Sequence, residues 1–419
     1  MGHRSTDVRE IEPALSFRLR QLSLASASEQ RQRGYVHTLA EIGQQPETWR
    51  VTARALAADA PRLIAFLRAA GIAPGRGVVI LSGSGSSHYV ADSLVLPLQQ
   101  ALRVPVQTVA SGSILTHPDQ IVPGDQPCLA VSFARSGDSP ESCGALDLLL
   151  ARRPECHHLI ITCNGRGRLA TSHLDDPRVL HVVLDDRTCD RSLVMTSSFT
   201  NMVLAGRMLA SLDKPDAYVA AADALADAAA RLLAHDADRI AEAAARPFSS
   251  VVFLASAARA GAAREASLKL LEMTEGRVRT LAETFLGLRH GPMSTVHGDT
   301  LIAGFLSSNP VARAYECDLL RELDRKRLGA GKLIAGSAVT EFSGAFPSAE
   351  PARASDVYVE YAAPTTHVAD DGLVLLDVLV AQLLAFFRCL EMGLKPDEPS
   401  SDGIINRVVG DFAIHRREP

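Results

Sequence analysis

Two series of short apolar segments, separated by a nearly constant interval, constrain the fold of this sequence more than any other feature. The first series comprises Val78–Leu81, Leu129–Phe133, Leu159–Thr162 and Leu180–Leu184. Each segment is bounded by Gly, Ser, Pro or Asp, and most are separated by stretches long enough for a helix. Apolar strands that alternate with helices are typical of a parallel sheet with helices on both faces. The sequence therefore predicts an α/β fold.

The same series occurs again in the second half of the chain. Val251, Leu301, Leu333 and Val357 follow their counterparts in the first series by 173, 172, 174 and 177 residues. Any α/β protein has strands at roughly regular spacing, but four matched intervals favour an internal duplication. We therefore expect two similar α/β domains, at 76–212 and 247–395.

The segments outside the two repeats differ from them in composition. Residues 1–75 read as a helical segment with a break at Gly43–Pro46. The alanine-rich stretch 213–246 predicts a linker helix, because alanine is the best helix former. Residues 396–419 form a tail that we expect to be irregular and docked on one domain.

Charge and cysteine content narrow the possible functions. The 43 basic and 48 acidic residues give a net charge of -5, spread without long runs, which argues against partnership with nucleic acid or a membrane surface. The most apolar stretch, Leu373–Leu390, contains Asp377, Gln382 and Arg388, which favours a buried or interface helix over a membrane span. Met1–Gln30 lacks the apolar core of a signal peptide, and the seven cysteines include no C-x-x-C pair. We expect a cytoplasmic protein with reduced thiols and no metal site.

Three hydroxyl-rich loops follow predicted strands or open predicted helices in the first domain. They are Ser82–Ser87, Ser132–Ser142 and Thr196–Thr200. Glycines let the backbone approach an anion, and a helix start directs N–H groups toward it. A Walker loop is absent, and a dinucleotide fingerprint would need glycine where His88 stands. Each loop alone fits an ordinary turn or cap. Because such loops gather at one edge of a parallel sheet, together they predict a site for a small phosphate.

The matching loops of the second domain carry less of this chemistry. Ala255–Arg259 stands where the first domain has its Ser-Gly series, and Ser307–Pro310 keeps only part of the second loop. We therefore expect one phosphate site per chain, in the first domain.

A predicted helix of the second domain places three charged side chains on one stripe. Glu265, Lys269 and Glu272 fall within about 60° of one another at 100° per residue. On spacing alone, a solvated face with a Glu–Lys pair is the simpler interpretation. The apolar neighbours Leu268 and Leu271 also allow partial burial, and a partly buried carboxylate near a cation can serve as a general base.

One histidine stands in a predicted loop of fixed shape. His290 lies eighteen residues after Glu272 and directly before Gly291-Pro292. A loop histidine is the usual proton carrier at neutral pH. Taken by itself, however, a lone histidine is more often an ordinary loop residue, so its position alone predicts no role.

Together these motifs resemble those of the sugar isomerase (SIS) domain. The matching segments, in SIS order, are Ser82–Ser87, Arg135–Ser142, Met195–Thr200, Glu265–Glu272 and Arg289–Pro292. The chain resembles double-SIS proteins of the tagatose-6-phosphate ketose/aldose isomerase and galactosamine-6-phosphate deaminase type. The likeness extends to Glu41–Pro46 with Trp49 and to Gly403–Val409. It implies two tandem SIS domains, each a flavodoxin-like sandwich of a parallel sheet between helices, after a helical N-terminal segment.

The resemblance also implies roles for individual residues. The family's phosphate pocket falls on the loops that carry Ser84, Ser86, Ser87, Arg135, Ser136 and Ser139, with Ser197 and Ser198 near the sugar. Its proton-shuttling glutamate falls on Glu272 and its ring-opening histidine on His290, while Lys269 lies in the matching helix with an open role. In related enzymes the histidine reaches the site from a neighbouring subunit. A homodimer or larger homo-oligomer with shared active sites is therefore expected.

Two absences separate the chain from glutamine-dependent glucosamine-6-phosphate synthases, which also resemble this double-SIS unit. Those enzymes carry an N-terminal glutaminase with a catalytic cysteine, whereas the first cysteine here is Cys128. They also place a Schiff-base lysine in the C-terminal tail, and Asn406–Gly410 contains none. In addition, Ala134 replaces a serine common in other SIS loops, so one phosphate contact is expected to be missing.

The expected activity is isomerising deamination of an amino-hexose 6-phosphate, for example galactosamine 6-phosphate to tagatose 6-phosphate and ammonia. His290 would assist ring opening and Glu272 would move a proton between C2 and C1, with no metal and no cofactor. Plain aldose–ketose isomerisation stays open, as does release of an amino acid from a glycated sugar phosphate. A sugar-phosphate sensor without turnover is a third alternative, although residues 1–75 show no basic recognition helix. The galacto or gluco configuration and the oligomer size are left open.

Overall fold

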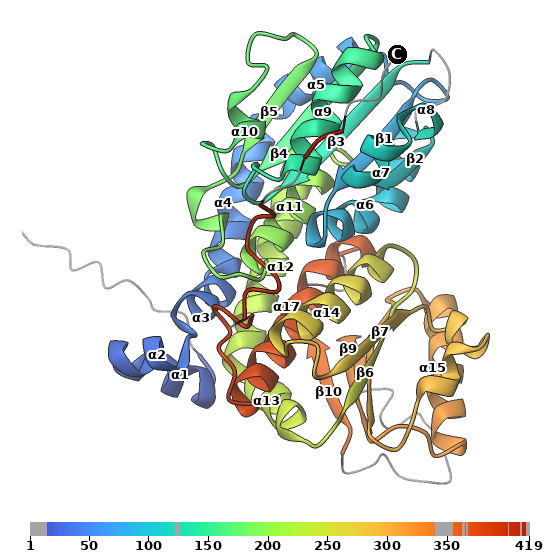
Figure 1. Ribbon diagram of the computed structural model, residues 1–419. Helices are drawn as coiled ribbons and strands as arrows, with labels where there is room; N and C mark the ends of the chain where they lie inside the picture. Colours follow the sequence, from blue (N-terminus) through green and yellow to red (C-terminus); the bar gives the residue numbers. More distant parts are fainter. Residues whose placement is uncertain are drawn as a thin grey trace, which may run out of the picture.

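Two five-stranded parallel sheets, one in each half of the chain, form the framework of the molecule (Figure 1). The computed structural model describes residues 15–121, 126–339, 355–362, 365, 368–400, 402–410 and 413–415. The first sheet has the strand order β2-β1-β3-β4-β5. Its strands are β1 (Val78–Gly83), β2 (Val106–Ala110), β3 (Cys128–Ala134), β4 (Cys156–Thr162) and β5 (Val179–Val183).

The second sheet repeats this topology. Its order is β10-β9-β8-β6-β7, which becomes the order of the first sheet when each strand is matched to its counterpart. The strands are β6 (Ser250–Leu254), β7 (Arg279–Glu283), β8 (Thr300–Leu306), β9 (Gly331–Ser337) and β10 (Val357–Tyr361). This is the flavodoxin-like order, in which ligands bind beyond the carboxyl ends of the strands. The predicted fold class, two parallel sheets flanked by helices, is confirmed.

One strand in each half lies outside the four segments that the apolar pattern predicted. β2 and β7 are edge strands whose residues are mostly half-buried, so neither has the continuous apolar run of a central strand. They begin at Val106 and Arg279, which are again 173 residues apart. The duplication therefore includes all five strands.

Helices cover both faces of each sheet. In the first half, α6 (Ser86–Leu102) and α11 (Ser197–Met208) pack on one face, while α7 (Ser111–Thr116) and α9 (Pro140–Arg152) pack on the other. In the second half, α14 (Ala260–Met273) and α17 (Asp370–Glu391) lie opposite α15 (Pro310–Arg325). The short elements are α8 (Pro118–Ile121), α10 (Arg168–Thr171), η1 (Asp186–Thr188), η2 (Ala257–Arg259), η3 (Gly287–Arg289) and η4 (Pro292–Thr295). The inner faces of the two sheets share one continuous core.

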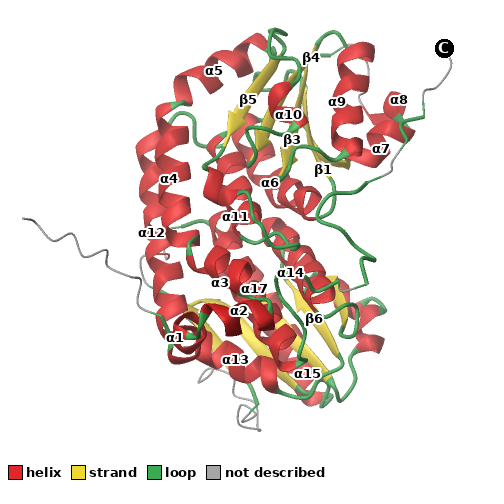
Figure 2. Cartoon of the chain, turned by 60° about the vertical axis from the view of Figure 1, so that its left-hand side comes forward, coloured by secondary structure: helices red, strands yellow, loops and turns green. Residues whose placement is uncertain are grey.

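The apolar helix α17 lies at the centre of this core (Figure 2). Among the described residues it is the one helix long and apolar enough to cross a membrane, but most of it is buried inside the protein. Its polar residues have internal partners: Asp377 pairs with Arg259, and Gln382 with Gln45. The predicted buried helix is thus observed.

In the described part of the N-terminal segment, residues 15–75, the chain forms five helices. They are α1 (Phe17–Leu24), α2 (Ala27–Arg33), α3 (Val36–Gly43), α4 (Gln45–Ala58) and α5 (Ala60–Ala69). The break predicted at Gly43–Pro46 falls between α3 and α4. In place of the single linker helix that the sequence predicted, the alanine-rich stretch forms α12 (Pro215–His235) and α13 (Ala237–Ala245), separated at Asp236. The break lets α12 follow α4 while α13 packs on α17 and α1.

Candidate functional site

A pocket of about 270 Å³ lies beyond the carboxyl ends of β1 and β3. Residues from five separate parts of the chain line it: the 84–87 and 133–142 loops, the Leu193–Met195 segment, the end of α14, and the C-terminal tail. The lining residues predicted from the sequence are Ser84, Ser86, Ser87, Arg135, Ser136, Ser139, Lys269 and Glu272. The fold therefore brings most of the predicted residues together, from both halves of the chain.

The loop between β1 and α6 forms one end of the pocket. Gly85 has φ of 56°, in the region that favours glycine, and α6 begins directly after it at Ser86. A Cβ on Gly83 would lie 2.5 Å from the backbone carbon of Ser87, so the turn also requires glycine there. The start of α6 consequently faces the pocket with its two serines and the positive end of its helix dipole, an arrangement suited to an anion.

A second helix start lies on the same side of the pocket. Gly137, with φ of 72°, turns the chain before α9 begins at Pro140. The Ser136 hydroxyl oxygen accepts from the Asp138 N–H at 3.2 Å, and the Ser139 hydroxyl donates to Glu141 at 2.7 Å. A phosphate bound here would therefore compete with Glu141 for the Ser139 proton.

Arg135 also lines the pocket, but its guanidinium is committed to the pocket walls. The side chain is buried and donates to the carbonyls of Ser192 and Leu193 at 3.1 and 2.8 Å. A further bond of 2.9 Å reaches the carbonyl of Arg407 in the tail. Arg135 thus joins two walls of the pocket.

Ser197 and Ser198 lie behind the pocket wall and are not among its lining residues in the described part of the chain. Both are fully buried, and both hydroxyls donate to the Asp190 carboxylate at 2.5 Å. The same carboxylate accepts from the backbone N–H groups of Thr196 and Ser198 at 2.7 and 2.8 Å. Asp190 therefore caps the start of α11, and the two serines help to hold that cap.

The charged stripe of α14 forms the opposite wall of the pocket. Lys269 is fully buried; its ammonium donates to the Glu272 carboxylate and lies 3.4 Å from Glu265 Oε1. Glu272 keeps 21% of its side chain exposed and lines the pocket. The simpler interpretation of this stripe, a solvated face, is wrong, because α6 and α17 pack against α14.

Burial and charge act in opposite directions within this stripe. Burial raises the pKa of Glu265 to about 8, although the nearby Lys269 ammonium lowers it. Burial lowers the pKa of Lys269, but the carboxylates of Glu265 and Glu272 outweigh burial and raise it. Lys269 therefore stays protonated beside Glu272 at neutral pH.

His290 is exposed, between η3 and η4 of the second half. Across the residues that the structure describes, it is not part of the lining of the pocket in its own chain. Its position on the surface leaves it available to a neighbouring copy of the chain.

A close crossing of α6 and α14 sets the distance between the two sides of the pocket. A Cβ on Gly261 of α14 would lie 2.2 Å from Ser93 Oγ and 2.7 Å from Ser93 N of α6. We expect Gly261→Ala to push the helices apart and lower the free energy of unfolding by about 1–3 kcal/mol, the usual effect of overpacking. Denaturant unfolding measures this. Gly112→Ala in α7, where a Cβ meets nothing within 4 Å, is the matched control. Equal stability of the two variants would contradict the expected close contact.

The C-terminal tail completes the pocket. Figure 1 shows it, in dark red, running alongside α11 toward β3 and α9. Residues 405–409 line the pocket, and the Arg407 guanidinium donates to the Asp190 carbonyl at 2.6 and 3.0 Å. In the described residues the tail is irregular and lies against the first half.

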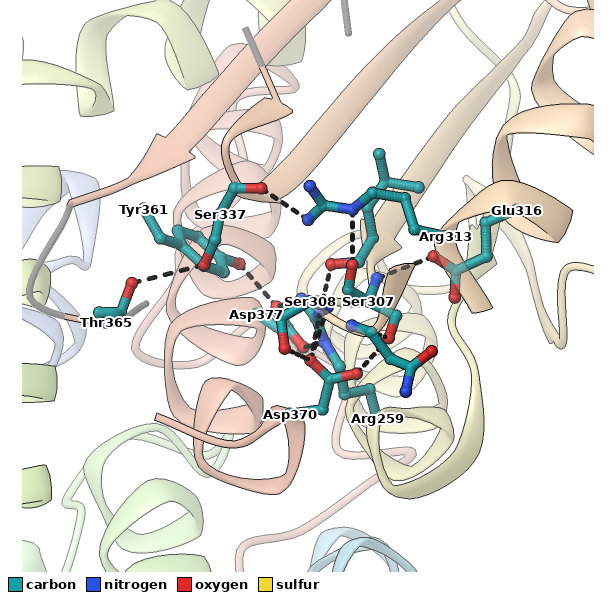
Figure 3. A network of polar contacts seen from close by, with 12 residues as sticks. Arg259, Ser307, Ser308, Arg313, Glu316, Ser337, Tyr361, Thr365, Asp370 and Asp377 are labelled. Carbon is teal, nitrogen blue, oxygen red and sulfur yellow. Dashed lines mark hydrogen bonds and ion pairs between the residues drawn. The ribbon is translucent and has the colours of Figure 1, made fainter. Parts of the chain in front are cut away.

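The corresponding edge of the second sheet is filled by the protein's own side chains (Figure 3). The Asp370 carboxylate accepts hydrogen bonds from both Ser307 and Ser308, including the Ser308 N–H at 2.7 Å. Arg259 is fully buried and pairs with Asp377 at 2.5 and 2.7 Å. An internal carboxylate thus takes the donors that an external anion would need, which agrees with the predicted loss of this site in the second half.

Sequence reasoning missed several residues of the pocket. Leu193 lines it without belonging to any predicted motif, and Ser142 and Met195 lie within predicted motifs but were not singled out as site residues. Asp190 and Glu41 hold the Leu193–Met195 segment in place but do not line the pocket themselves. Of Asp190 and Glu41, only Glu41 gave a signal, because the Glu41–Pro46 segment resembles double-SIS proteins.

Comparison with known proteins places this geometry in a family. No protein-family model matches the sequence. A D-galactosamine-6-phosphate deaminase AgaS of Shewanella sp. (strain ANA-3) is 33% identical over 94% of this chain and 95% of its own. A Streptomyces coelicolor protein that also carries the name AgaS is 38% identical over 91% of this chain and 95% of its own.

A solved structure agrees with these relatives. The crystal structure of tagatose-6-phosphate ketose/aldose isomerase from Escherichia coli matches with a TM-score of 0.79 and 28% identity, over 94% of this chain and 99% of that one. The protein is accordingly a phosphosugar isomerase or deaminase. The chain belongs to the double-SIS family that includes the AgaS galactosamine-6-phosphate deaminases and the tagatose-6-phosphate ketose/aldose isomerases.

Proposed function

We propose that this enzyme deaminates and isomerises a 2-amino-2-deoxyhexose 6-phosphate, with D-galactosamine 6-phosphate as substrate and tagatose 6-phosphate and ammonia as products. The observation that carries this proposal is the position of Glu272, beside the Lys269 ammonium and in the same pocket as two serine-rich helix starts. The AgaS names of the relatives favour an amino sugar as substrate.

The phosphate is assigned to the end of the pocket formed by the starts of α6 and α9. Ser86, Ser87, Ser136 and Ser139 would donate to its oxygens, together with backbone N–H groups of the two helix starts. Hydrogen bonds to a charged group typically contribute about 1.5–3 kcal/mol each, so four or more give firm binding without a lysine. Ser84 and Arg135 complete this end, while Ser197 and Ser198 support it from behind through Asp190.

The sugar would extend from the phosphate toward α14, which brings C1 and C2 to Glu272. His290 of a neighbouring subunit would open the ring by moving a proton between O1 and O5. Glu272 would then take the proton from C2 and return one to C1, which converts the aldehyde and amine into a ketose imine. Water adds to C2 of the imine and ammonia leaves, so substrate and water become ketose 6-phosphate and ammonia.

The role we assign to Lys269 is to stabilise the negative charge of the Glu272 carboxylate. The ammonium stabilises the ionised carboxylate before the proton is taken, and it can stabilise negative charge developing at O1 of the enediol-like intermediate. Glu265, fully buried on the far side of the ammonium, fixes its position.

The second candidate is plain aldose–ketose isomerisation, which the Escherichia coli isomerase structure favours. Ring opening and proton transfer between C1 and C2 are common to both reactions. Only the loss of nitrogen separates them.

A panel of hexose and hexosamine 6-phosphates, with ammonia and ketose both measured, distinguishes the two reactions. We expect equal amounts of ammonia and tagatose 6-phosphate from galactosamine 6-phosphate, and little turnover of galactose 6-phosphate. Ketose formation from galactose 6-phosphate without ammonia from the amino sugar would favour the isomerase instead. Tight binding without turnover of any of these compounds would favour a sensor.

A further inference from the structure

We propose that Glu41, in the N-terminal helix α3, is a positioning residue for the substrate pocket: it holds the 190–196 segment that carries one wall. The inference rests on the proposed function for the identity of the ligand. Glu41 lies outside both sheets, and neither the phosphate loops nor the charged stripe of α14 includes it.

The Glu41 carboxylate is almost fully buried, with 6% of the residue exposed, and it accepts several hydrogen bonds from one short segment. The Arg191 N–H donates at 2.5 Å and the Ser192 N–H at 3.2 Å, both to Oε1. The Ser192 hydroxyl donates to the other oxygen. A carboxylate that takes two backbone N–H groups and a hydroxyl fixes the path of the backbone at that point.

The segment that Glu41 holds supports three parts of the pocket. Its Leu193 and Met195 line the cavity directly. Its carbonyls at 192 and 193 anchor Arg135 of the β3–α9 loop. Its Asp190 carbonyl anchors Arg407 of the tail. A displacement of the 190–196 segment would therefore reach the β3–α9 wall and the tail wall together.

The helix α3 is itself held by the first residues of the tail. Asp397 caps α3 through the Thr38 N–H at 2.7 Å and the Thr38 hydroxyl at 2.8 Å. The carbonyl of Asp397 also accepts from the Leu193 N–H at 2.9 Å. Helix α3, the 190–196 segment and the tail thus form a closed ring of contacts around one side of the pocket.

The hold of Glu41 on the 190–196 segment depends on whether its carboxyl is ionised. Burial and the neighbouring Asp190 carboxylate raise its pKa to about 7, against the hydrogen bonds from Ser192 and Arg191. The cations nearest Asp190 are Arg135 and Arg407, and the Arg407 guanidinium donates to the Asp190 carbonyl. From α17, the uncharged Gln382 amide donates to the Thr196 carbonyl. Protonation of Glu41 would place an O–H where the segment offers donors, and the hold on the segment would weaken.

Asp238 provides a matched comparison elsewhere in the fold. Its carboxylate accepts from the Ser16 hydroxyl at 2.6 Å and from the N–H groups of Phe17 and Arg18 at 3.1 and 3.0 Å. These are the same kinds of donors that Glu41 receives, but they anchor α1, which does not line the pocket described above. A loss that is only structural should affect both sites alike.

The test compares Glu41→Ala with Asp238→Ala in the full chain. We expect both variants to lose thermal stability, whereas only Glu41→Ala raises KM for galactosamine 6-phosphate by about tenfold, the effect typical of losing a hydrogen bond to a charged group. Calorimetric binding of inorganic phosphate should weaken in the same variant. Equal KM and phosphate affinity in the two variants would overturn the proposal.

Glu41→Gln decides the question if Glu41→Ala does not fold. In the wild type we expect KM to rise as pH falls through about 7, where Glu41 takes up its proton. This part of the pH profile should be absent in Glu41→Gln, and its persistence would count against Glu41. If the wild type releases no ammonia, the proposed function fails, but the phosphate-binding comparison still decides the role of Glu41.

Discussion

Glu272→Gln is expected to lower kcat for ammonia release from galactosamine 6-phosphate by about 10²–10⁴-fold, the range that general base catalysis supplies. The amide keeps the size of the side chain but cannot accept the C2 proton. Since the carboxyl is assigned to C1 and C2 and the phosphate to the opposite end of the pocket, KM should change by less than about threefold. Steady-state kinetics with an ammonia assay measures both constants.

Glu391→Gln serves as the control for this variant. Glu391 lies at the end of α17 in a partly exposed ion pair with Arg18, away from the pocket, and its replacement should leave kcat unchanged. Full ammonia release by Glu272→Gln would exclude Glu272 as the base. A rise in KM with unchanged kcat would instead make it a binding residue.

Lys269→Met is expected to destabilise the protein by about 3 kcal/mol at pH 9, because it leaves the fully buried Glu265 without its ammonium partner. The methionine retains the length of the aliphatic stem. The same variant should lose most activity, since Glu272 also loses its paired cation. Denaturant unfolding at several pH values measures the stability change.

The pH dependence of this effect follows from the carboxyl of Glu265. Its pKa in the folded protein, about 8, lies above its ordinary value of 4.5, so folding takes up a proton between these values and stability falls as pH rises through them. Without Lys269 the pKa of Glu265 in the folded protein rises further, so the stability of the variant continues to fall at higher pH. The difference from the wild type should therefore be smallest near pH 5 and grow above about pH 8. The double variant Lys269→Met with Glu265→Gln should recover stability at pH 9; no recovery would contradict the pairing.

The central strands could be predicted from the sequence because they are buried on both faces. Segments such as Val78–Leu81 are short, continuously apolar and bounded by Gly77 and Ser82. The edge strands β2 and β7 are half exposed, so they carry no comparable signal. The break of the alanine-rich helix at Asp236 was also missed, because it depends on which helices α12 and α13 pack against.

The phosphate loops were predictable because their chemistry is local. A strand, a Gly-Ser turn and a helix start stand next to one another in the chain, and topology brings two such turns to one edge. The burial of Lys269 was not predictable, since spacing alone favoured a solvated stripe and only the packing of α6 and α17 on α14 decides otherwise. The role of Glu41 depends on contacts across about 150 positions, which no local pattern reports.

The central claim is that hydroxyls of the first half hold the phosphate while Glu272 of the second half works at C1 and C2. A crystal structure of the Glu272→Gln protein with galactosamine 6-phosphate tests it most directly. We expect the phosphate among Ser86, Ser87 and Ser136, with C2 about 3–3.5 Å from the side chain at position 272, the separation of a near-attack geometry. A phosphate bound elsewhere, or a C2 atom far from position 272 in every subunit, would contradict the claim.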